Sequence, residues 1–176
     1  MRKYILYLLC IFPLVSGFQV NPGTDTNARI KSVFIYNFTR YIEWPAEYKK
    51  GNFVITVFGS NTGILTELQN MAKVKKVGEQ AIEVRNTTSL DGLAKSNILY
   101  IAPDVTISLG DVVSKLKGKS TLLVTEKSGY AKQGAAINFV VMENKQKFEL
   151  NKTNAEKYSL KVSAALENLA IPVQKP

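Results

Sequence analysis

The sequence predicts an α/β fold: a three-layer sandwich with a mostly parallel central sheet and a C-terminal antiparallel hairpin. Apolar runs of strand length recur through the middle of the chain and alternate with segments of helical periodicity. The connections between them are short, which favours βαβ units and helices on both faces of a parallel sheet. The last third breaks this alternation, because residues 136–142 and 147–150 are strand-like runs on either side of a short polar turn.

Residues 1–17 have the layout of a secretory signal peptide. Arg2 and Lys3 precede an apolar run that is too short to span a bilayer, and the run leads to Gly17, a small residue suited to cleavage. Cleavage there removes Cys10, the only cysteine of the chain. The mature protein would then depend for its stability on burial and not on disulfides.

We expect residues 18–27 to form a lead-in and residues 28–172 a single α/β domain, since a chain of 176 residues suits one hydrophobic core. The first helix begins after the potential N-cap residues 25–27 and ends before Pro45, which restricts the residue that precedes it. Its apolar positions recur at spacings of four and three, so we expect them to face the core. They are Ile30, Phe34, Phe38 and Tyr41.

The other elements follow in the order expected for such a sheet. The predicted strands are residues 53–58, 81–84, 97–102 and 120–125, followed by the two strands of the hairpin. The first of these runs is apolar at nearly every position, which is typical of a strand buried on both faces. The predicted helices are one capped by Thr62, a short helix or turn at 90–95, residues 108–117, and a final helix that contains Tyr158, Leu160, Val162, Leu166 and Leu169.

Composition argues against several classes of enzyme. The chain has no histidine, and cleavage would leave it without cysteine, so the usual general base near neutral pH, the common zinc ligands and the Ser–His and Cys–His pairs are missing. Carboxylate chemistry stays open in principle, but the candidate acids are not paired at a suggestive spacing. They are Asp91, Asp104, Asp111, Glu126 and Glu143. We therefore expect a protein that is not an enzyme and that holds no metal or cofactor.

The net charge of +9 leaves two interpretations open. A basic exported protein can meet anionic lipid or an acidic partner. The lysines, however, occur singly or in pairs without interleaved aromatic residues, which favours a solvated surface and argues against a nucleic-acid partner.

Two loops at predicted strand ends form the first candidate binding site. The carboxyl ends of parallel strands meet at one edge of an open sheet, where ligands of α/β folds bind, and a glycine turn that opens a helix can offer backbone N–H groups to an anion. The residues are Gly59, Ser60, Asn61, Thr62, Thr125, Ser128 and Gly129. A plain strand-to-helix connection is the alternative, because a lone glycine turn is a weak motif.

The segment IYNFTRYIEWP, residues 35–45, is the second candidate. It combines four aromatic rings with an amide, an arginine and the only tryptophan of the chain. Aromatic residues and arginine dominate the hot spots of protein interfaces, whereas a helix that packs its rings in the core is the structural alternative. The contact candidates in this segment are Arg40, Tyr41, Glu43 and Trp44.

The same segment opens a series of motifs that covers nearly the whole mature chain. KSVFIYNF and YIEWP are followed in order by FVITVFG, NILYI, GYA with QG, AINF, FELN and LKVS. In these motifs the sequence resembles the YfiR-like family of exported bacterial proteins. Two departures stand out: Ser96-Asn97 occupies a place where the family commonly has a cysteine, and Gly134-Ala135 replaces a Gly-Gly pair.

This resemblance implies a compact periplasmic domain without a catalytic role. The best-understood family member binds the periplasmic part of a membrane-anchored diguanylate cyclase and holds it inactive. The implied function is therefore that of a periplasmic regulator, which binds and modulates a membrane-anchored signalling protein such as a diguanylate cyclase or a sensor kinase. A homodimer is compatible with this role, and no stable membrane insertion is expected after signal cleavage. The alternative is a periplasmic small-molecule binding module that uses the strand-end loops.

Overall fold

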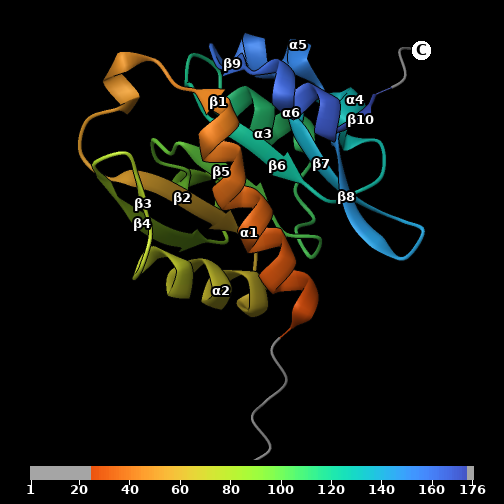
Figure 1. Ribbon diagram of the computed structural model, residues 1–176, viewed down its shortest axis with the longest axis horizontal. Coiled ribbons are helices and arrows are strands. Elements are labelled where there is room, and N and C mark those ends of the chain that lie inside the picture. The colour runs from red at the N-terminus through yellow and green to blue at the C-terminus, as the bar shows by residue number, and fades with distance from the viewer. Residues whose placement is uncertain (1–24, 174–176) are drawn as a thin grey trace, which may run out of the picture.

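The computed structural model describes residues 25–173, so the predicted signal peptide and residues 18–24 of the predicted lead-in lie outside the described residues. Four parallel strands form the centre of the sheet (Figure 1). They are β2 (Phe53–Phe58), β4 (Gln80–Thr87), β5 (Ile98–Ile101) and β6 (Leu122–Thr125). β2, β5 and β6 are buried along their whole length, as their continuous apolar runs predicted. β4 is longer than predicted because its exposed polar residues do not mark it as a strand.

The predicted hairpin is confirmed. β7 (Ile137–Met142) runs parallel to β6, and β8 (Lys145–Leu150) returns antiparallel to β7. The two connecting residues, Glu143 and Asn144, both have positive φ angles of 52° and 58°. Two such residues in a two-residue loop make a type I′ turn, whose twist matches that of the flanking strands.

Two short strands complete the edges of the sheet. β3 (Lys76–Val77) pairs antiparallel with β4, and β10 (Ile171–Pro172) pairs parallel with β8. The order across the eight strands is β10-β8-β7-β6-β5-β2-β4-β3. The sheet is therefore mostly parallel with an antiparallel C-terminal pair, as predicted.

Helices cover both faces of the sheet. The unit β2-α2-β4, with α2 at Thr62–Ala72, and the unit β5-α3-β6, with α3 at Leu109–Lys115, leave the centre of the sheet in opposite directions. Right-handed crossovers then place α2 and α3 on opposite faces. α1 (Thr26–Tyr41) packs beside α2, and α4 (Tyr130–Gln133) packs beside α3 (Figure 1). The three-layer prediction is confirmed, and a 3₁₀ turn at Leu90–Gly92 stands where a short helix or turn was expected.

The prediction of one long final helix is wrong. The chain instead forms α5 (Lys152–Lys157), β9 (Lys161–Val162) and α6 (Ala164–Leu169). Ser159 adopts a positive φ of 57°, which a continuous right-handed helix does not allow. Ser163 then caps α6 by accepting a hydrogen bond from the backbone N–H of Leu166.

The interruption is explained by a two-stranded ribbon outside the main sheet. β9 pairs antiparallel with β1 (Ile42–Glu43), the strand that directly follows α1, and Ile42 lies opposite Val162. The backbone N–H of Ser163 also donates to the carbonyl oxygen of Tyr41 at 2.9 Å. A late segment of the chain thereby fixes the end of the first helix.

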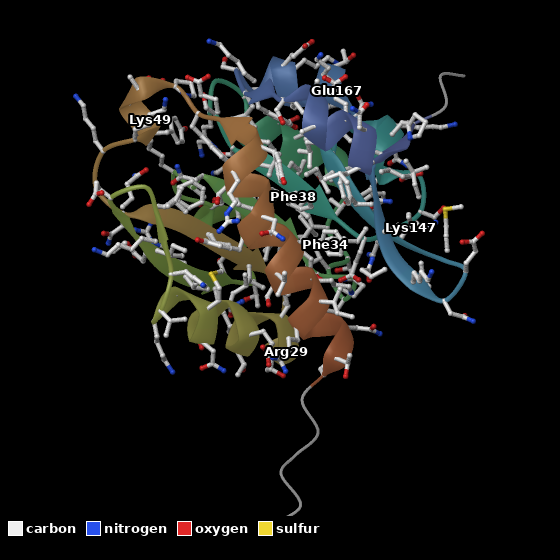
Figure 2. The ribbon with its side chains drawn as sticks, viewed as in Figure 1. Arg29, Phe34, Phe38, Lys49, Lys147 and Glu167 are labelled. Atoms are coloured by element: carbon white, nitrogen blue, oxygen red, sulfur yellow. The ribbon has the colours of Figure 1, made fainter. Side chains whose placement is uncertain are left out.

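The core-facing stripe of α1 differs from the predicted one. The buried positions are Ala28, Ser32, Ile35 and Phe38, whereas Ile30 is 37% exposed. The rotation of α1 follows from an aromatic cluster, because Phe34 and Phe38 pack against Phe139 and Phe148 of the hairpin. Figure 2 labels the two residues of α1. Packing of α1 against the hairpin therefore leaves Ile30 on the outer side of the helix.

Candidate interaction surface

The outer face of α1 carries apolar side chains that no other described element covers. Ile30 is 37% and Val33 53% exposed, and both line a shallow groove of about 240 Å³ along the helix. The groove also contains Arg29, Phe34 and Asn37, and Arg29, Val33 and Asn37 recur every four residues and so share one side of α1. Figure 2 shows Arg29 near the start of this helix and Phe34 further along it. This groove and its continuation to Arg40 are called the outer face of α1 below.

Two arginines, Arg29 and Arg40, lie along the outer face of α1. Among the ion pairs of the described residues, neither Arg29 nor Arg40 takes part in one. The Arg40 guanidinium lies 5.4 Å from the centre of the Tyr36 ring, so it keeps a cation–π contact and remains exposed. The face thus combines apolar area with two cationic groups that have unused hydrogen-bonding capacity.

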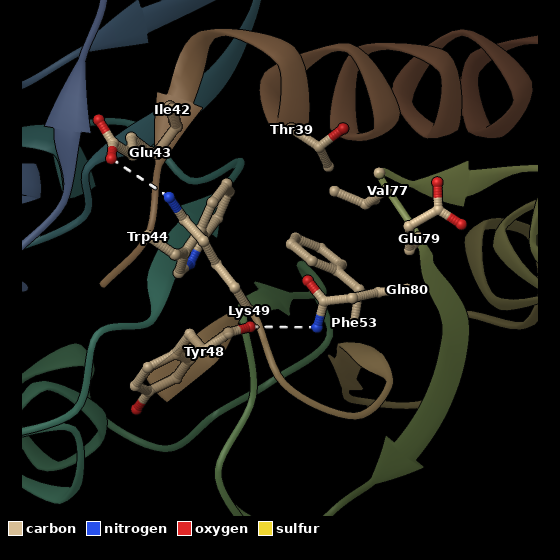
Figure 3. Close-up of a pocket in the computed structure, with 11 residues that line it drawn as sticks. Thr39, Ile42, Glu43, Trp44, Tyr48, Lys49, Phe53, Val77, Glu79 and Gln80 are labelled. Atoms are coloured by element: carbon tan, nitrogen blue, oxygen red, sulfur yellow. Dashed lines mark hydrogen bonds and ion pairs between the residues drawn. The ribbon is translucent and has the colours of Figure 1, made fainter. Parts of the chain in front are cut away.

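A pocket of about 370 Å³ adjoins the C-terminal end of α1 (Figure 3). Its inner wall is aromatic, because Trp44, Tyr48 and Phe53 line it from the segment after α1 and from β2. The rings of Trp44 and Phe53 meet edge to face, with centroids 5.1 Å apart and an angle of 85°. Val77 and Gln80 line the other side from β3 and β4. A pocket of this size and lining can take one apolar side chain or a small ligand.

Charged groups frame this pocket. Lys49 donates to the Glu43 carboxylate at 3.2 Å, and Figure 3 shows this pair beside the Trp44 ring. The hydrogen bond from Lys49, together with the charge of Lys161, lowers the pKa of Glu43. The Gln80 amide donates to the carbonyl oxygens of Tyr48 and Gly51, which fixes the 3₁₀ turn that follows Trp44. The rim is therefore polar and the floor apolar.

The four contact candidates occupy different places. Arg40 and Glu43 are exposed, and Tyr41 is half-buried. Trp44 is only 5% exposed, and its indole N–H donates to the carbonyl oxygen of Asn97 at 3.1 Å. Trp44 is thus a core residue whose ring forms part of the pocket wall, so a partner can touch it only from inside that pocket. The arrangement brings Glu43 and Trp44 to one pocket and leaves Arg40 on the helix.

The first strand-end loop is filled by the protein itself. The backbone N–H of Ser60 donates to the Asp104 carboxylate at 2.7 Å. Asn61, and not the predicted Thr62, caps α2 by accepting a hydrogen bond from the N–H of Ile64. The backbone at Gly59 has a φ of 125° and packs so tightly that a Cβ atom there would lie 2.7 Å from the Cβ of Ala102. A carboxylate of the chain stands where an anionic ligand was expected.

In the second strand-end loop, the Thr125 side chain also forms hydrogen bonds within the protein. The Thr125 hydroxyl is buried and donates to the side-chain oxygen of Asn138 at 2.7 Å, and the Asn138 amide donates to Glu149 at 2.9 Å. Gly129 has a φ of 80° and precedes α4, while Ser128 is exposed. Neither loop lines the groove on α1 or the pocket beside Trp44.

A polar network at this edge of the sheet was missed by sequence reasoning. Lys31 from α1 forms an ion pair with Glu126, which follows β6, and the Tyr100 hydroxyl donates to the same carboxylate. Burial and the neighbouring Glu126 charge raise the pKa of Tyr100 above its usual range. A signal was present: Lys31 lies one helical turn before the buried Ile35, and a lysine on that side needs a partner.

Two further observations concern the described residues 25–173. They contain no group of three or more aspartate, glutamate, histidine or cysteine side chains placed to share a metal ion. They also contain no helix with the length and hydropathy needed to cross a membrane.

Comparison with known proteins identifies relatives by family and by fold. A family model described as YfiR/HmsC-like matches residues 28–171. No match is found among curated proteins. Two solved structures share the fold: the ABC domain in complex with L-Trp from Streptococcus pneumonia, with 12% identity and a TM-score of 0.55, and a conserved domain protein from Vibrio cholerae O1 biovar El Tor strain N16961, with 13% identity and a TM-score of 0.57. Each alignment covers 84% of this chain and 60% of the other, so the chain spans well under the full length of these structures.

Proposed function

Because this chain belongs to the YfiR/HmsC-like family, we propose that it is a non-enzymatic periplasmic regulator that binds the periplasmic part of a membrane-anchored signalling protein. A diguanylate cyclase and a sensor kinase are the partner classes that fit this role. The regulator acts by occupancy: it binds one state of the partner more tightly than another and so shifts the balance between them. Inhibition follows if the inactive state is the one preferred.

The observation that carries this proposal is the uncovered outer face of α1. Val33 is 53% exposed at the centre of a groove whose lining is mainly apolar, with Arg29 and Arg40 on the same helix. A contiguous exposed apolar patch rimmed by polar residues is typical of an interaction site, and arginine is enriched at protein interfaces. We propose that Arg40, Tyr41 and Glu43 extend this contact to the pocket beside Trp44, which receives one side chain of the partner.

The small-molecule binding module at the strand-end loops finds less support. The N–H of Ser60 is bonded to Asp104 and the hydroxyl of Thr125 to Asn138, so the groups expected to hold a ligand already have partners. A ligand there would have to displace bonds inside the fold, which costs more than filling an open groove.

Crosslinking in the native envelope tests the regulator proposal. Tagged mature protein is crosslinked and purified as wild type, as Val33→Asp and as Arg40→Ala. We expect one inner-membrane signalling protein to be recovered with the wild type and its yield to fall at least about tenfold in both variants, since a buried hot spot contributes more than about 1.4 kcal/mol.

Matched controls separate this face from surface changes in general. Val74→Asp places the same charge at a valine that is 76% exposed between α2 and β3. Arg85→Ala removes an exposed arginine of β4 that pairs with Glu83. Both controls should retain the partner. Equal loss in Val33→Asp and Val74→Asp, or recovery of no membrane protein by the wild type, would contradict the proposal.

A further inference from the structure

A second cavity lies away from α1, where three helices end. Its volume is about 360 Å³, and the ends of α3, α4 and α5 surround it (Figure 1 shows these helices). One lysine reaches it from each: Lys117 follows α3, Lys132 belongs to α4, and Lys157 is the last residue of α5. These three residues and their cavity are called the lysine pocket below.

The lysine pocket is strongly cationic. None of its three ammonium groups takes part in an ion pair among the described residues. Lys157 has only a long contact of 3.5 Å with the side-chain oxygen of Asn154. The helix ends offset part of this charge, because the C-terminus of a helix carries roughly half a negative charge at most. Three full positive charges outweigh that contribution, so the pocket attracts anions.

The floor of the lysine pocket is rigid and partly apolar. Val113 and Tyr158 line it, and the Tyr158 hydroxyl donates to the carbonyl oxygen of Gly134 at 3.1 Å. Burial raises the pKa of Tyr158 to about 12, so its ring remains neutral at physiological pH. The Asn154 amide is buried and donates to the carbonyl oxygens of Ala131 and Ala135, both at 2.9 Å. These bonds hold the floor in one geometry before any ligand arrives.

Two glycines line the lysine pocket, and one of them leaves open space in its wall. Gly118 has a φ of 72°, and a Cβ atom there would meet open space within 4 Å. Gly134 has a φ of 132° and lies against Val113. Because Gly118 has no side chain, a ligand can approach the backbone there closely. At Gly134 the corresponding space is filled by Val113, whose Cγ2 would lie 2.7 Å from an added Cβ atom.

We propose that the lysine pocket binds a small multivalent anion, with phosphate or carboxylate groups that contact Lys117, Lys132 and Lys157. A partly apolar body of the ligand packs on Val113 and the Tyr158 ring. Several ammonium groups around one cavity suit a ligand with two or more negative charges better than a monovalent ion. The same chemistry is offered by a free solute and by a phosphate-bearing headgroup at an envelope surface, and the test below separates them.

The test uses pyrophosphate as the probe and the whole mature protein. Titration followed by amide NMR should give saturable shifts at Gly118 and Gly134. The triple variant K117Q/K132Q/K157Q should weaken binding at least about tenfold, since charge-assisted hydrogen bonds are the strong ones. A matched variant, K73Q/K75Q/K76Q, removes the same charge from three exposed lysines, two between α2 and β3 and one at the start of β3, and should bind as the wild type does. Thermal melting of both variants checks that they are folded.

Sedimentation with phosphatidylglycerol vesicles separates the two ligand sources. Binding to vesicles that is lost only in K117Q/K132Q/K157Q and that pyrophosphate displaces would identify a headgroup as the ligand. Saturable pyrophosphate binding without vesicle binding would identify a free solute. Shifts that do not saturate, or equal weakening in the two triple variants, would overturn the proposal, because both outcomes mean that general charge and not this pocket attracts the anion.

Discussion

The strand-end edge of the sheet and the outer face of α1 differ in how far their side chains are used in contacts within the protein. At the strand-end edge the polar groups bond one another: Ser60 bonds Asp104, and both Lys31 and Tyr100 bond Glu126. On the outer face of α1 the exposed valine and isoleucine have no such partners within residues 25–173. A region rich in polar residues is therefore not a binding site for that reason alone. Measurements of stability at both regions test this contrast.

The largest effect is expected at Gly59, on the strand-end edge. Gly59→Ala should destabilise the protein by about 3 kcal/mol, because the new methyl group meets Ala102 and Asp104 below 3.0 Å at a φ that alanine rarely adopts. Urea unfolding measures this change. Gly51→Ala is the control, since Gly51 also has a positive φ but open space around it, and should cost about 1 kcal/mol. Equal losses would mean that close packing at Gly59 is not the cause.

The next effect concerns the ion pair of the same edge. The side chains of Lys31 and Glu126 are 15% and 12% exposed, so Glu126→Gln leaves a largely buried ammonium without its counter-charge. We expect a loss of about 2 kcal/mol, reduced from the fully buried case by the remaining solvent. Lys31→Met added to Glu126→Gln should recover part of it, and a double-mutant cycle measures the coupling. A single variant as stable as the wild type would show that the network is dispensable.

A smaller, pH-dependent effect is expected from Tyr100. Burial and the charge of Glu126 raise the pKa of Tyr100 in the folded protein, whereas a tyrosine in the unfolded chain has a pKa of about 10. The stability that neutral Tyr100 contributes to the folded protein is therefore fully present below about pH 10. It is lost as the pH rises further. Tyr100→Phe should cost about 1 kcal/mol at neutral pH and lose less stability on going to alkaline pH than the wild type. Tyr158, whose pKa is raised to about 12 by burial, stays in both proteins as an internal reference. Parallel curves of stability against pH would contradict the assignment.

The smallest effect is expected on the outer face of α1. Val33→Ala should change the free energy of unfolding by no more than about 0.5 kcal/mol, because the side chain is half exposed. Ile35→Ala, two residues away in the same helix, should cost about 3 kcal/mol, since Ile35 is fully buried. Chemical denaturation of the two variants measures both values. A large loss in Val33→Ala would indicate that this face supports the fold and is not free for a partner.

Much of the fold could be predicted from the sequence. The buried strands and the hairpin were visible because apolar runs and turn residues report local structure directly. The prediction of one final helix was wrong because the break at Ser159 and the strand at Lys161–Val162 depend on pairing with Ile42–Glu43, which is far away in the sequence. No local pattern encodes such a partner.

The candidate site was harder to predict, for a related reason. The segment after Asp25 was correctly interpreted as a helix, but its rotation is set by the aromatic contacts of Phe34 and Phe38 with the hairpin. That rotation exposes Ile30, which the periodicity alone had placed in the core. It also turns Lys31 towards Glu126, so both the open face and the closed network follow from one tertiary contact.

The ribbon of β1 and β9 has a consequence for the order in which the protein can fold. Ile42 pairs with Val162, so this contact has a very long sequence separation. The chain is synthesised from its N-terminus, and contacts of this kind form late because a long loop must close first. The end of α1 therefore receives its fixed geometry only after β9 has been synthesised, and a truncated product that lacks β9 would keep the helix but not its anchored end.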